Sequence, residues 1–432
     1  MSSFEGFYPD ASGEMTLASI TNHKKFMRNI LYILLFLPVI SFGQTSNQND
    51  NKISIGTIET IQSNILNEKR EILVYVPTSG GVDTKTRYPV LYILDGASFF
   101  HSVTGMVHYL SAIGKMPEMI VVAIVNTDRV RDLTPTHSTS WSNGEQDATH
   151  FKNSGGGEKF ISFIERELIP YIDSHYKTEP YRMFVGHSLG GLMVMNTLIN
   201  NPKLFNSYVA IDPSIWWDNK TIMKQAAIVL KQKDYTGKKL FFASANTMNK
   251  GMDTIRVLKD TANGNLHVRD NLQFREILKN NKNNKLDWKW KYYNDDNHPS
   301  VPLIAEYDAL RSFFKTYELP KDLDDRSINA EYIINHYRTI STMLGYSVLP
   351  PQSIINFLGY NNLSSKLYDK AYSFFKMNID NYPASANAFD SMGDFYVEKN
   401  DTINAIESFE KALSFKEVSE SRKKLEKLQA RK

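Results

Sequence analysis

The feature that most constrains the fold is an alternation of strand-length apolar runs with helix-length amphipathic stretches between residues 53 and 314. Residues 71–77 alternate apolar and polar side chains, as an outer antiparallel strand does. Five later runs are apolar throughout, like strands buried in a parallel sheet, at residues 89–96, 118–126, 181–188, 207–214 and 238–246. Helices are predicted at residues 160–176, 189–200, 222–233, 268–280 and 303–317. With a last strand at 286–294, the sequence predicts an α/β fold with a doubly wound, mostly parallel sheet.

The chain changes character after a polar, charged stretch at residues 317–327, which predicts a linker. Only helical patterns follow, and matching residues recur 34 positions apart: Gly359 and Gly393, Ala371 and Ala405, Phe375 and Phe409. This spacing resembles tetratricopeptide repeats, in which small residues lie where two helices cross and large ones fill the gap. Asn362 departs from the tyrosine of that signature, and a helical hairpin that matches by coincidence is the alternative. We expect an all-α, tetratricopeptide-like repeat domain at residues 328–432, with capping helices at 328–354.

The N-terminal segment has the layout of a secretory signal peptide. Basic residues lie just before an apolar run at residues 30–42, which is short for a membrane span. We therefore expect residues 1–43 to be an N-terminal extension and signal peptide, and the mature protein to begin near Gln44 in the periplasm or outside the cell. An N-terminal membrane anchor is the alternative. Because a polar stretch precedes the basic residues, the choice between Met1 and Met27 as the start stays open.

Composition excludes several classes of function. The chain contains no cysteine, which rules out disulfides, thiolate catalysis, cysteine-bound zinc and a lipoprotein anchor. Its 50 basic and 47 acidic residues give a formal net charge of +3, and they form no basic stripe of the kind that binds nucleic acid. No two histidines have the spacing of zinc ligands. We therefore expect no metal, no other cofactor and no nucleic-acid partner.

One serine lies between glycines where a predicted strand meets a predicted helix, in the segment MFVGHSLGGLMV at residues 183–194. Gly186 and Gly190 lack Cβ atoms, so the chain can turn sharply here and present the Ser188 hydroxyl above the sheet edge. A G-x-S-x-G segment alone is a weak signal, and a tight turn that happens to contain a serine is the alternative. The preceding buried strand and the following helix favour a nucleophilic Ser188. His187 is expected to be structural.

A serine hydroxyl is a poor nucleophile until a base takes its proton, and histidine is the residue type expected for that role. The histidines well downstream of Ser188 are His267, His298 and His336. His298 is predicted as the base, because it lies in the loop directly after the last strand. His267 falls at the start of a predicted helix, and His336 lies beyond the predicted linker.

The acid that orients the imidazole is predicted after the strand at 238–246 or the one at 207–214, before the histidine in chain order. Asp253 is the first choice, Asp260 and Asp212 are alternatives, and a dyad without an acid stays open. Asp295 and Asp296 are expected to be solvated loop charges.

Two backbone N–H groups are needed to bind the oxyanion of an acyl-transfer intermediate. One is predicted at Leu189, at the start of the helix that follows the serine. The other is predicted in the loop after the strand at 89–96, at Gly96 or Ala97, where a glycine lets the backbone approach the substrate.

Five segments, taken in order, resemble the putative esterase family of α/β-hydrolases: YPVLYILDGASFF, IVNTDRVRDLTPT, FVGHSLGG, IDPSIWW and HPSVPLIAEYDALR. That family includes siderophore (enterobactin-type) esterases, S-formylglutathione hydrolases, feruloyl and acetyl-xylan esterases, and mycolyltransferases. The resemblance covers about residues 55–315, is closest to the siderophore-esterase branch, and implies an α/β-hydrolase (esterase) domain at residues 44–318. It matches Ser188 and His298 to the nucleophile and the base.

The resemblance also implies roles in substrate binding. Trp216 and Trp217 would line an acyl or aromatic pocket, with core packing as the alternative. Arg129 or Arg131 would face an anionic substrate, with a surface charge as the alternative. Two departures limit the analogy, because no acid stands out close behind the strand at 238–246 and the well-known siderophore esterases have no repeat domain.

Together, these features predict an exported serine hydrolase that cleaves carboxylic esters through an acyl-enzyme intermediate. The alternatives are an acyltransferase or a carbohydrate (feruloyl or acetyl) esterase of the same fold, and a non-catalytic protein that binds partners through its repeats. The expected substrate is a small-molecule ester. The tetratricopeptide-like repeats are candidates for contact with another protein or with a second copy of the chain.

Overall fold

The computed structural model describes residues 53–77, 86–141 and 143–430. The extension and signal peptide predicted at residues 1–43 lie outside these described residues. From Ser54 onward the chain belongs to one compact unit. None of the helices in the described part of the chain combines the length and apolar character needed to cross a membrane.

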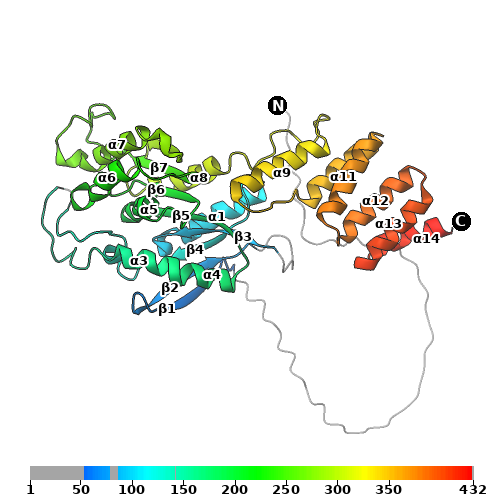
Figure 1. Ribbon diagram of the computed structural model, residues 1–432, viewed down its shortest axis with the longest axis horizontal. Coiled ribbons are helices and arrows are strands. Elements are labelled where there is room, and N and C mark those ends of the chain that lie inside the picture. The colour runs from blue at the N-terminus through cyan, green and yellow to red at the C-terminus, as the bar shows by residue number, and fades with distance from the viewer. Residues whose placement is uncertain (1–52, 78–85, 142, 431–432) are drawn as a thin grey trace, which may run out of the picture. The chain divides into compact units, whose positions relative to one another are not determined.

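The described strands form an eight-stranded sheet in the order β1-β2-β4-β3-β5-β6-β7-β8 (Figure 1). Their bounds are β1 (Thr57–Ser63), β2 (Glu68–Tyr75), β3 (Tyr88–Ile93), β4 (Ile120–Ile124), β5 (Thr178–His187), β6 (Ser207–Ile211), β7 (Lys239–Ala245) and β8 (Asp287–Tyr293). β2 pairs antiparallel with both β1 and β4, and all other neighbours are parallel. The prediction of a mostly parallel sheet with an outer antiparallel strand is confirmed, and β1 adds an edge strand that was not predicted.

Helices cover both faces of this sheet, and on each face a cluster of buried residues lies between the sheet and its helices. α1 (Gly96–Ala112) and α8 (Val301–Phe313) pack on one face. The helical elements on the other side are α3 (Gly157–Phe163), the π-helical turn η1 (Ile164–Leu168), α4 (Ile169–His175), α5 (Leu189–Asn200), α6 (Trp217–Val229) and α7 (Leu266–Lys279). Short turns of helix complete the domain at α2 (Arg129–Asp132), η2 (Asn263–Asn265) and η3 (Lys282–Asn284).

The double cover explains the unbroken apolar runs of the sequence. Successive residues of a strand point to opposite faces of a sheet. In β3, Val90 and Tyr92 lie in the cluster with α5, while Leu91 and Ile93 lie in the cluster with α1 and α8. Both faces of this strand are therefore buried and apolar, as expected for the central strands of a doubly wound sheet.

The C-terminal region is all-helical, as predicted. It contains α9 (Ala330–Leu344), α10 (Gln352–Ser364), α11 (Tyr368–Asn381), α12 (Ala386–Glu398), α13 (Thr402–Phe415) and α14 (Ser419–Gln429). A Cβ atom on Gly359 would lie 2.5 Å from the Phe375 ring, and one on Gly393 would lie 2.6 Å from the Phe409 ring. The 34-residue period of the sequence therefore corresponds to one helix contact that is made twice.

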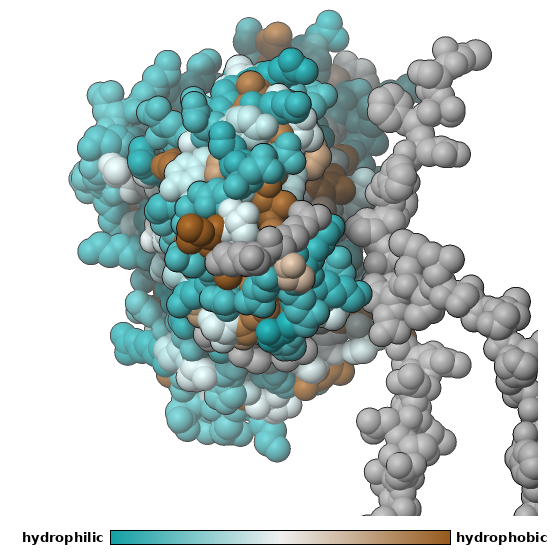
Figure 2. Space-filling model, turned by 90° about the vertical axis from the view of Figure 1, so that its right-hand side faces the viewer, coloured by the Kyte–Doolittle hydropathy of each residue, from teal (hydrophilic) through white to brown (hydrophobic). Residues whose placement is uncertain are grey.

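The surface of this helical region is mostly hydrophilic. Hydrophilic residues predominate on the face shown in Figure 2, and hydrophobic ones are isolated or in small groups among them. Scattered exposed apolar residues of this kind are normal on protein surfaces and do not by themselves mark a docking face.

The segment predicted as a linker at 317–327 is packed against the core. Tyr317, Leu319 and Leu323 lie against a buried cluster that includes Phe313 of α8 and Ile333 of α9. The hydrophobic core therefore continues from α8 past this segment into α9.

Candidate active site

Ser188 stands at the corner between β5 and α5, at the carboxyl edge of the parallel strands. Its φ of 60° and ψ of −118° lie outside the usual regions for a residue with a Cβ atom, and such conformations cost about 1–3 kcal/mol. A Cβ atom on Gly186 would lie 2.4 Å from the Gly190 carbonyl oxygen, so the corner needs a glycine there. Backbone hydrogen bonds hold it: Ser188 N–H donates to Ile211 O and Ser214 N–H donates to Ser188 O, both at 3.0 Å.

His298 lies in the loop between β8 and α8 and contacts the serine. Its Nε2 is 3.0 Å from Ser188 Oγ, and its Nδ1 is 2.6 Å from Asp212 Oδ2. Ser188 Oγ also lies 3.3 Å from the buried Ser214 Oγ. In the tautomer with a proton on Nδ1, His298 donates to the carboxylate and leaves Nε2 free to accept the serine proton. The structure thus brings together the two residues predicted as nucleophile and base.

Asp212 follows β6 directly and is fully buried. Its Oδ1 accepts hydrogen bonds from Ala245 N–H (3.0 Å) and Asn271 Nδ2 (3.2 Å), and its Oδ2 accepts from His298 Nδ1 (2.6 Å) and His267 Nε2 (2.9 Å). Burial alone would raise the pKa of this carboxyl. The charges of the two imidazoles and their hydrogen bonds outweigh that effect and hold the pKa of Asp212 well below its usual range. Asp212 is therefore a carboxylate at neutral pH.

The structure contradicts the prediction that Asp253 orients the base. Asp253 is exposed, and its Oδ1 accepts from the backbone N–H groups of Ile255 (2.9 Å) and Arg256 (2.7 Å) in a local turn. Asp260, an alternative, accepts instead from Asn265 Nδ2 at 2.6 Å. The partner of the base is Asp212, the remaining alternative, because β6 pairs with β5 and Asp212 follows β6 directly.

Two helix starts face this edge of the sheet. Leu189 begins α5 directly after the serine, and Gly96 and Ala97 begin α1 after Asp95, whose φ is 55°. N–H groups in the first turn of a helix have no acceptor within the helix and carry partial positive charge. Packing also requires a glycine at position 96, since a Cβ atom there would lie 2.7 Å from the Ala123 carbonyl carbon of β4.

Arg129 is bound to the protein itself, which contradicts its predicted role with an anionic substrate. Its Nε donates to Asp95 Oδ1 (2.6 Å), and its Nη2 donates to Asp95 Oδ2 (3.0 Å) and to the His187 carbonyl oxygen (3.4 Å). Asn126 Nδ2 donates to the same Asp95 Oδ1 at 2.6 Å. The guanidinium is neutralised by Asp95 and joins the segments that follow β3 and β4 to the last residue of β5.

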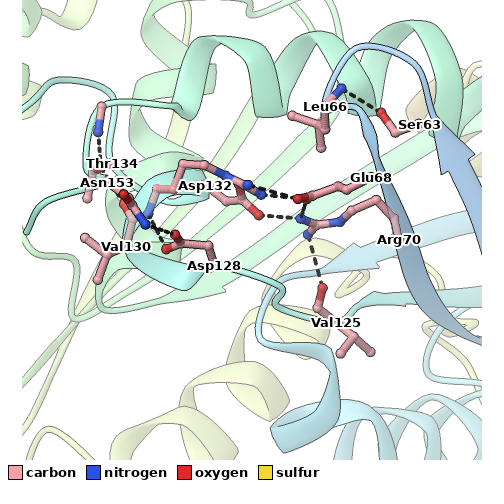
Figure 3. Close-up of polar contacts among 12 residues, drawn as sticks. Ser63, Leu66, Glu68, Arg70, Val125, Asp128, Val130, Asp132, Thr134 and Asn153 are labelled. Carbon is pink, nitrogen blue, oxygen red and sulfur yellow. Dashed lines mark hydrogen bonds and ion pairs between the residues drawn. The ribbon is translucent and has the colours of Figure 1, made fainter. Parts of the chain in front are cut away.

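Arg131, the other arginine considered for substrate binding, belongs to a separate network. Figure 3 labels Glu68, Arg70 and Asp132 of this network. Its Nη2 donates to Glu68 (2.6 Å) and its Nε to Asp132 (2.7 Å), while the buried Arg70 binds the same two carboxylates at 2.8 and 2.5 Å. Hydrogen bonds from Arg131 and Arg70 lower the pKa of Glu68 against the opposing effect of its burial. The network ties α2 and the loop after β4 to β2, and Arg70 extends it to the Val125 carbonyl oxygen (3.1 Å).

The two tryptophans differ. Trp217 is buried, donates from Nε1 to the Thr136 carbonyl oxygen (3.0 Å) and packs edge-on against Phe151, with 5.2 Å between ring centroids. The predicted pocket role is therefore wrong for Trp217, which fills the core. Trp216 is half-buried, with its ring centroid 5.8 Å from that of Trp217, and it stays a candidate for substrate contact.

Two further histidines lie beside the hydrogen-bonded residues Ser188, His298 and Asp212. His187 is mostly buried, its ring centroid is 4.4 Å from that of His298, and burial together with that neighbour lowers the pKa of His187 to about 4. No role was predicted for His267, because this histidine falls at the start of a predicted helix. Ligand-type atoms of Asp212, His267 and His298 lie within 4.8 Å of one another, and both imidazoles are hydrogen-bonded to Asp212.

Comparison with known proteins agrees with this architecture. The family described as "Putative esterase" matches residues 63–301, more than half of the chain. The ferri-bacillibactin esterase BesA of Bacillus subtilis (strain 168) is 30% identical over 196 residues, which are 42% of this chain and 67% of that protein. An IroE-like serine hydrolase from Shewanella oneidensis has a TM-score of 0.64 at 29% identity, covering 75% of this chain and 98% of that one.

A second solved structure extends the likeness in fold. An uncharacterised protein from Capnocytophaga ochracea has a TM-score of 0.60 at 20% identity, covering 87% of this chain and 99% of that one. Coverage of that extent includes part of the C-terminal helices as well as the sheet domain. The chain belongs to the "Putative esterase" family of α/β-hydrolases and is an esterase with an all-helical C-terminal region.

Proposed function

We propose that the protein hydrolyses carboxylic esters through an acyl-enzyme intermediate on Ser188. The observation that carries this proposal is the continuous relay from Ser188 Oγ to His298 Nε2 (3.0 Å) and from His298 Nδ1 to Asp212 Oδ2 (2.6 Å). In this relay the buried carboxylate fixes the tautomer and orientation of the imidazole, and the imidazole serves as the base.

The first half-reaction acylates the serine. Ser188 Oγ attacks the ester carbonyl carbon while His298 Nε2 takes its proton, and the carbonyl oxygen becomes an oxyanion. We assign the oxyanion to the N–H of Leu189 and to that of Gly96 or Ala97, which lie at the starts of α5 and α1. When the intermediate collapses, the alkoxide leaves as an alcohol with the proton from His298, and the acyl group stays on Ser188.

The second half-reaction releases the acid. A water molecule replaces the alcohol, and His298 takes a proton from it as its oxygen attacks the acyl carbon. The resulting oxyanion collapses, Ser188 Oγ leaves and regains its proton from His298, and the carboxylic acid dissociates. Asp212 keeps its charge throughout and stabilises each imidazolium that forms.

Ester-linked siderophores are the substrate class that we propose to test first. Support comes from a relative whose name gives ferri-bacillibactin as its substrate and from the half-buried Trp216, which lies two residues after Ser214, the neighbour of Ser188 Oγ. We also propose that the protein is exported and acts outside the cytoplasm, on the strength of the signal-peptide pattern at residues 1–43. We propose in addition that the C-terminal helices form tetratricopeptide-like repeats, and the paired Gly–Phe contacts support this proposal.

The test is Ser188→Ala, assayed with short p-nitrophenyl esters. Loss of the nucleophile should lower kcat/KM by at least about 10³-fold, while the melting temperature stays within a few degrees of that of the unaltered protein. Ser174→Ala, at an exposed helical serine of α4, is the matched control and should leave activity unchanged. A fluorophosphonate probe should label Ser188 in the unaltered protein. Retained hydrolysis in Ser188→Ala, or labelling at another residue, would remove Ser188 from the mechanism.

A further inference from the structure

Asp212 is shared by two imidazoles. His267, at the start of α7, approaches Asp212 Oδ2 through its Nε2 at 2.9 Å, and His298 approaches the same oxygen at 2.6 Å. The two rings stand almost perpendicular, at 82°, with their centroids 4.9 Å apart. A serine–histidine–carboxylate relay requires only one imidazole on its acid, so the proposed mechanism leaves His267 unexplained.

His267 is surrounded by charged and titratable groups from several elements. Asp212 comes from the end of β6, and His298 comes from the loop after β8. On α7 itself, the buried Asp270 adds a further negative charge and is bound in turn by Lys220 Nζ of α6 at 2.6 Å. Tyr292 of β8 lies within electrostatic reach of Asp212, and burial raises the pKa of this phenol to about 12, so it is neutral at neutral pH.

These surroundings favour a charged His267. Its burial would lower the pKa of the imidazole, but the Asp212 carboxylate, through its charge and its hydrogen bond, and the charge of Asp270 outweigh burial and raise the pKa of His267 above its ordinary value. His267 is therefore expected to hold its proton to a higher pH than a free histidine does.

We propose that His267 is a positioning residue that shares the Asp212 carboxylate with His298 and, as a cation, keeps His298 in its basic form at lower pH than Asp212 alone would allow. The inference rests on the proposed roles of Ser188, His298 and Asp212. Its physical basis is repulsion, because a second imidazolium beside the first must share one carboxylate and face a like charge 4.9 Å away. A charged His267 therefore opposes a second positive charge on His298, and activity extends further into acid.

The test is the pH profile of kcat/KM for His267→Gln, measured beside the unaltered enzyme and Ser188→Ala. The glutamine amide can still donate a hydrogen bond to Asp212 Oδ2 but carries no charge. Two unit charges 4.9 Å apart interact by roughly 0.6–2.5 pH units for effective permittivities between 80 and 20. We expect the midpoint of the acidic limb to move up by about one pH unit, with the alkaline plateau changed by only a few-fold.

A purely structural role for His267 predicts a different result, in which kcat/KM falls by the same factor at every pH and the midpoint does not move. That result in a folded His267→Gln would overturn the inference. If this variant does not fold, ¹⁵N NMR titration of the histidine rings in the unaltered protein decides. As the pH falls, the ring of His267 should take up its proton before that of His298, and the reverse order would overturn the inference. Activity in Ser188→Ala would instead count against the proposed function.

Discussion

The substitution Asp212→Asn gives the sharpest test of whether Asp212 fixes the protonation of His298. In the structure every neighbour of this carboxylate is a donor: Ala245 N–H and Asn271 Nδ2 at Oδ1, and the nitrogens of His298 and His267 at Oδ2. An asparagine keeps the size of the side chain but turns one oxygen into an NH₂ group. That group needs an acceptor, and His298 can supply one only by moving its proton from Nδ1 to Nε2. A protonated Nε2 faces Ser188 Oγ as a donor and can no longer take its proton.

The magnitude follows from the same geometry. With an effective permittivity of 20, a unit positive charge 2.6 Å from a carboxylate is stabilised by about 6 kcal/mol. At 1.36 kcal/mol per factor of ten, loss of this stabilisation corresponds to roughly four to five orders of magnitude in rate. A wrong tautomer in a relay of this kind costs about 10⁴ in kcat, which agrees with the electrostatic figure. We therefore expect Asp212→Asn to lower kcat/KM by about 10⁴-fold.

The assay is hydrolysis of p-nitrophenyl acetate at pH 7.5, with thermal unfolding measured on each variant. Asp253→Asn is the matched control, because this exposed carboxylate binds only backbone N–H groups and the exposed Arg256 side chain of its own turn, and its kcat/KM should stay within about twofold of the unaltered value. The reasoning would be refuted if Asp212→Asn kept activity within about tenfold of the unaltered enzyme while folded, or if Asp253→Asn were the variant that lost it.

Two further substitutions test the packing of the sheet domain. Glu306 of α8 is buried, none of the described residues binds its Oε2, and burial raises the pKa of its carboxyl to about 8 from 4.5. Because this carboxyl ionises at lower pH in the unfolded chain than in the folded protein, the free energy of unfolding is not reduced below pH 4.5 and falls by about 3 kcal/mol by pH 7. Urea unfolding between pH 4.5 and 7.5 should show that Glu306→Gln removes this fall. The same fall in the variant and in the unaltered protein would contradict the reasoning. Gly186→Ala places a Cβ atom 2.4 Å from the Gly190 carbonyl oxygen and should cut kcat/KM by at least about 10²-fold, whereas Gly105→Ala, with open space at its Cβ in α1, should keep activity and melting temperature.

The sheet was largely predictable because burial on both faces leaves a strong signal. In the runs that form β3 to β7, the side chains on both faces of the strand are apolar, so the strands could be predicted without deciding which face is buried. β1 escaped prediction because it pairs only with β2 at the edge and buries only Ile61 and Ser63. α1 escaped because it contains Gly96, Gly105 and residues with branched Cβ atoms, which lower helix propensity, and only packing on the sheet makes it a helix.

The serine and the base were predictable for a different reason. Glycines flank Ser188, and His298 is a loop histidine directly after the last strand, so type and position agree for both. For the acid, chain order admitted three aspartates and did not rank them by position in space. The register of the sheet does so, because His187 of β5 pairs with Ile211 of β6 and the residues that follow each, Ser188 and Asp212, leave the sheet at the same level.

The polar groups of the site converge because three strands end in the same unusual way. In an extended strand, side chains alternate between the two faces of the sheet and none points off its edge. Asp95, Ser188 and Asp212 follow β3, β5 and β6 with φ values of 55°, 60° and 40°, and this break in the extended chain turns each side chain toward the edge. Each strained residue is held by a strong polar contact: Asp95 by Arg129, and Ser188 and Asp212 by His298. In a sequence, glycines indicate a sharp turn, whereas an aspartate gives no sign that its φ is positive. For that reason the sequence predicted the turn at Ser188 and did not predict the turn at Asp212.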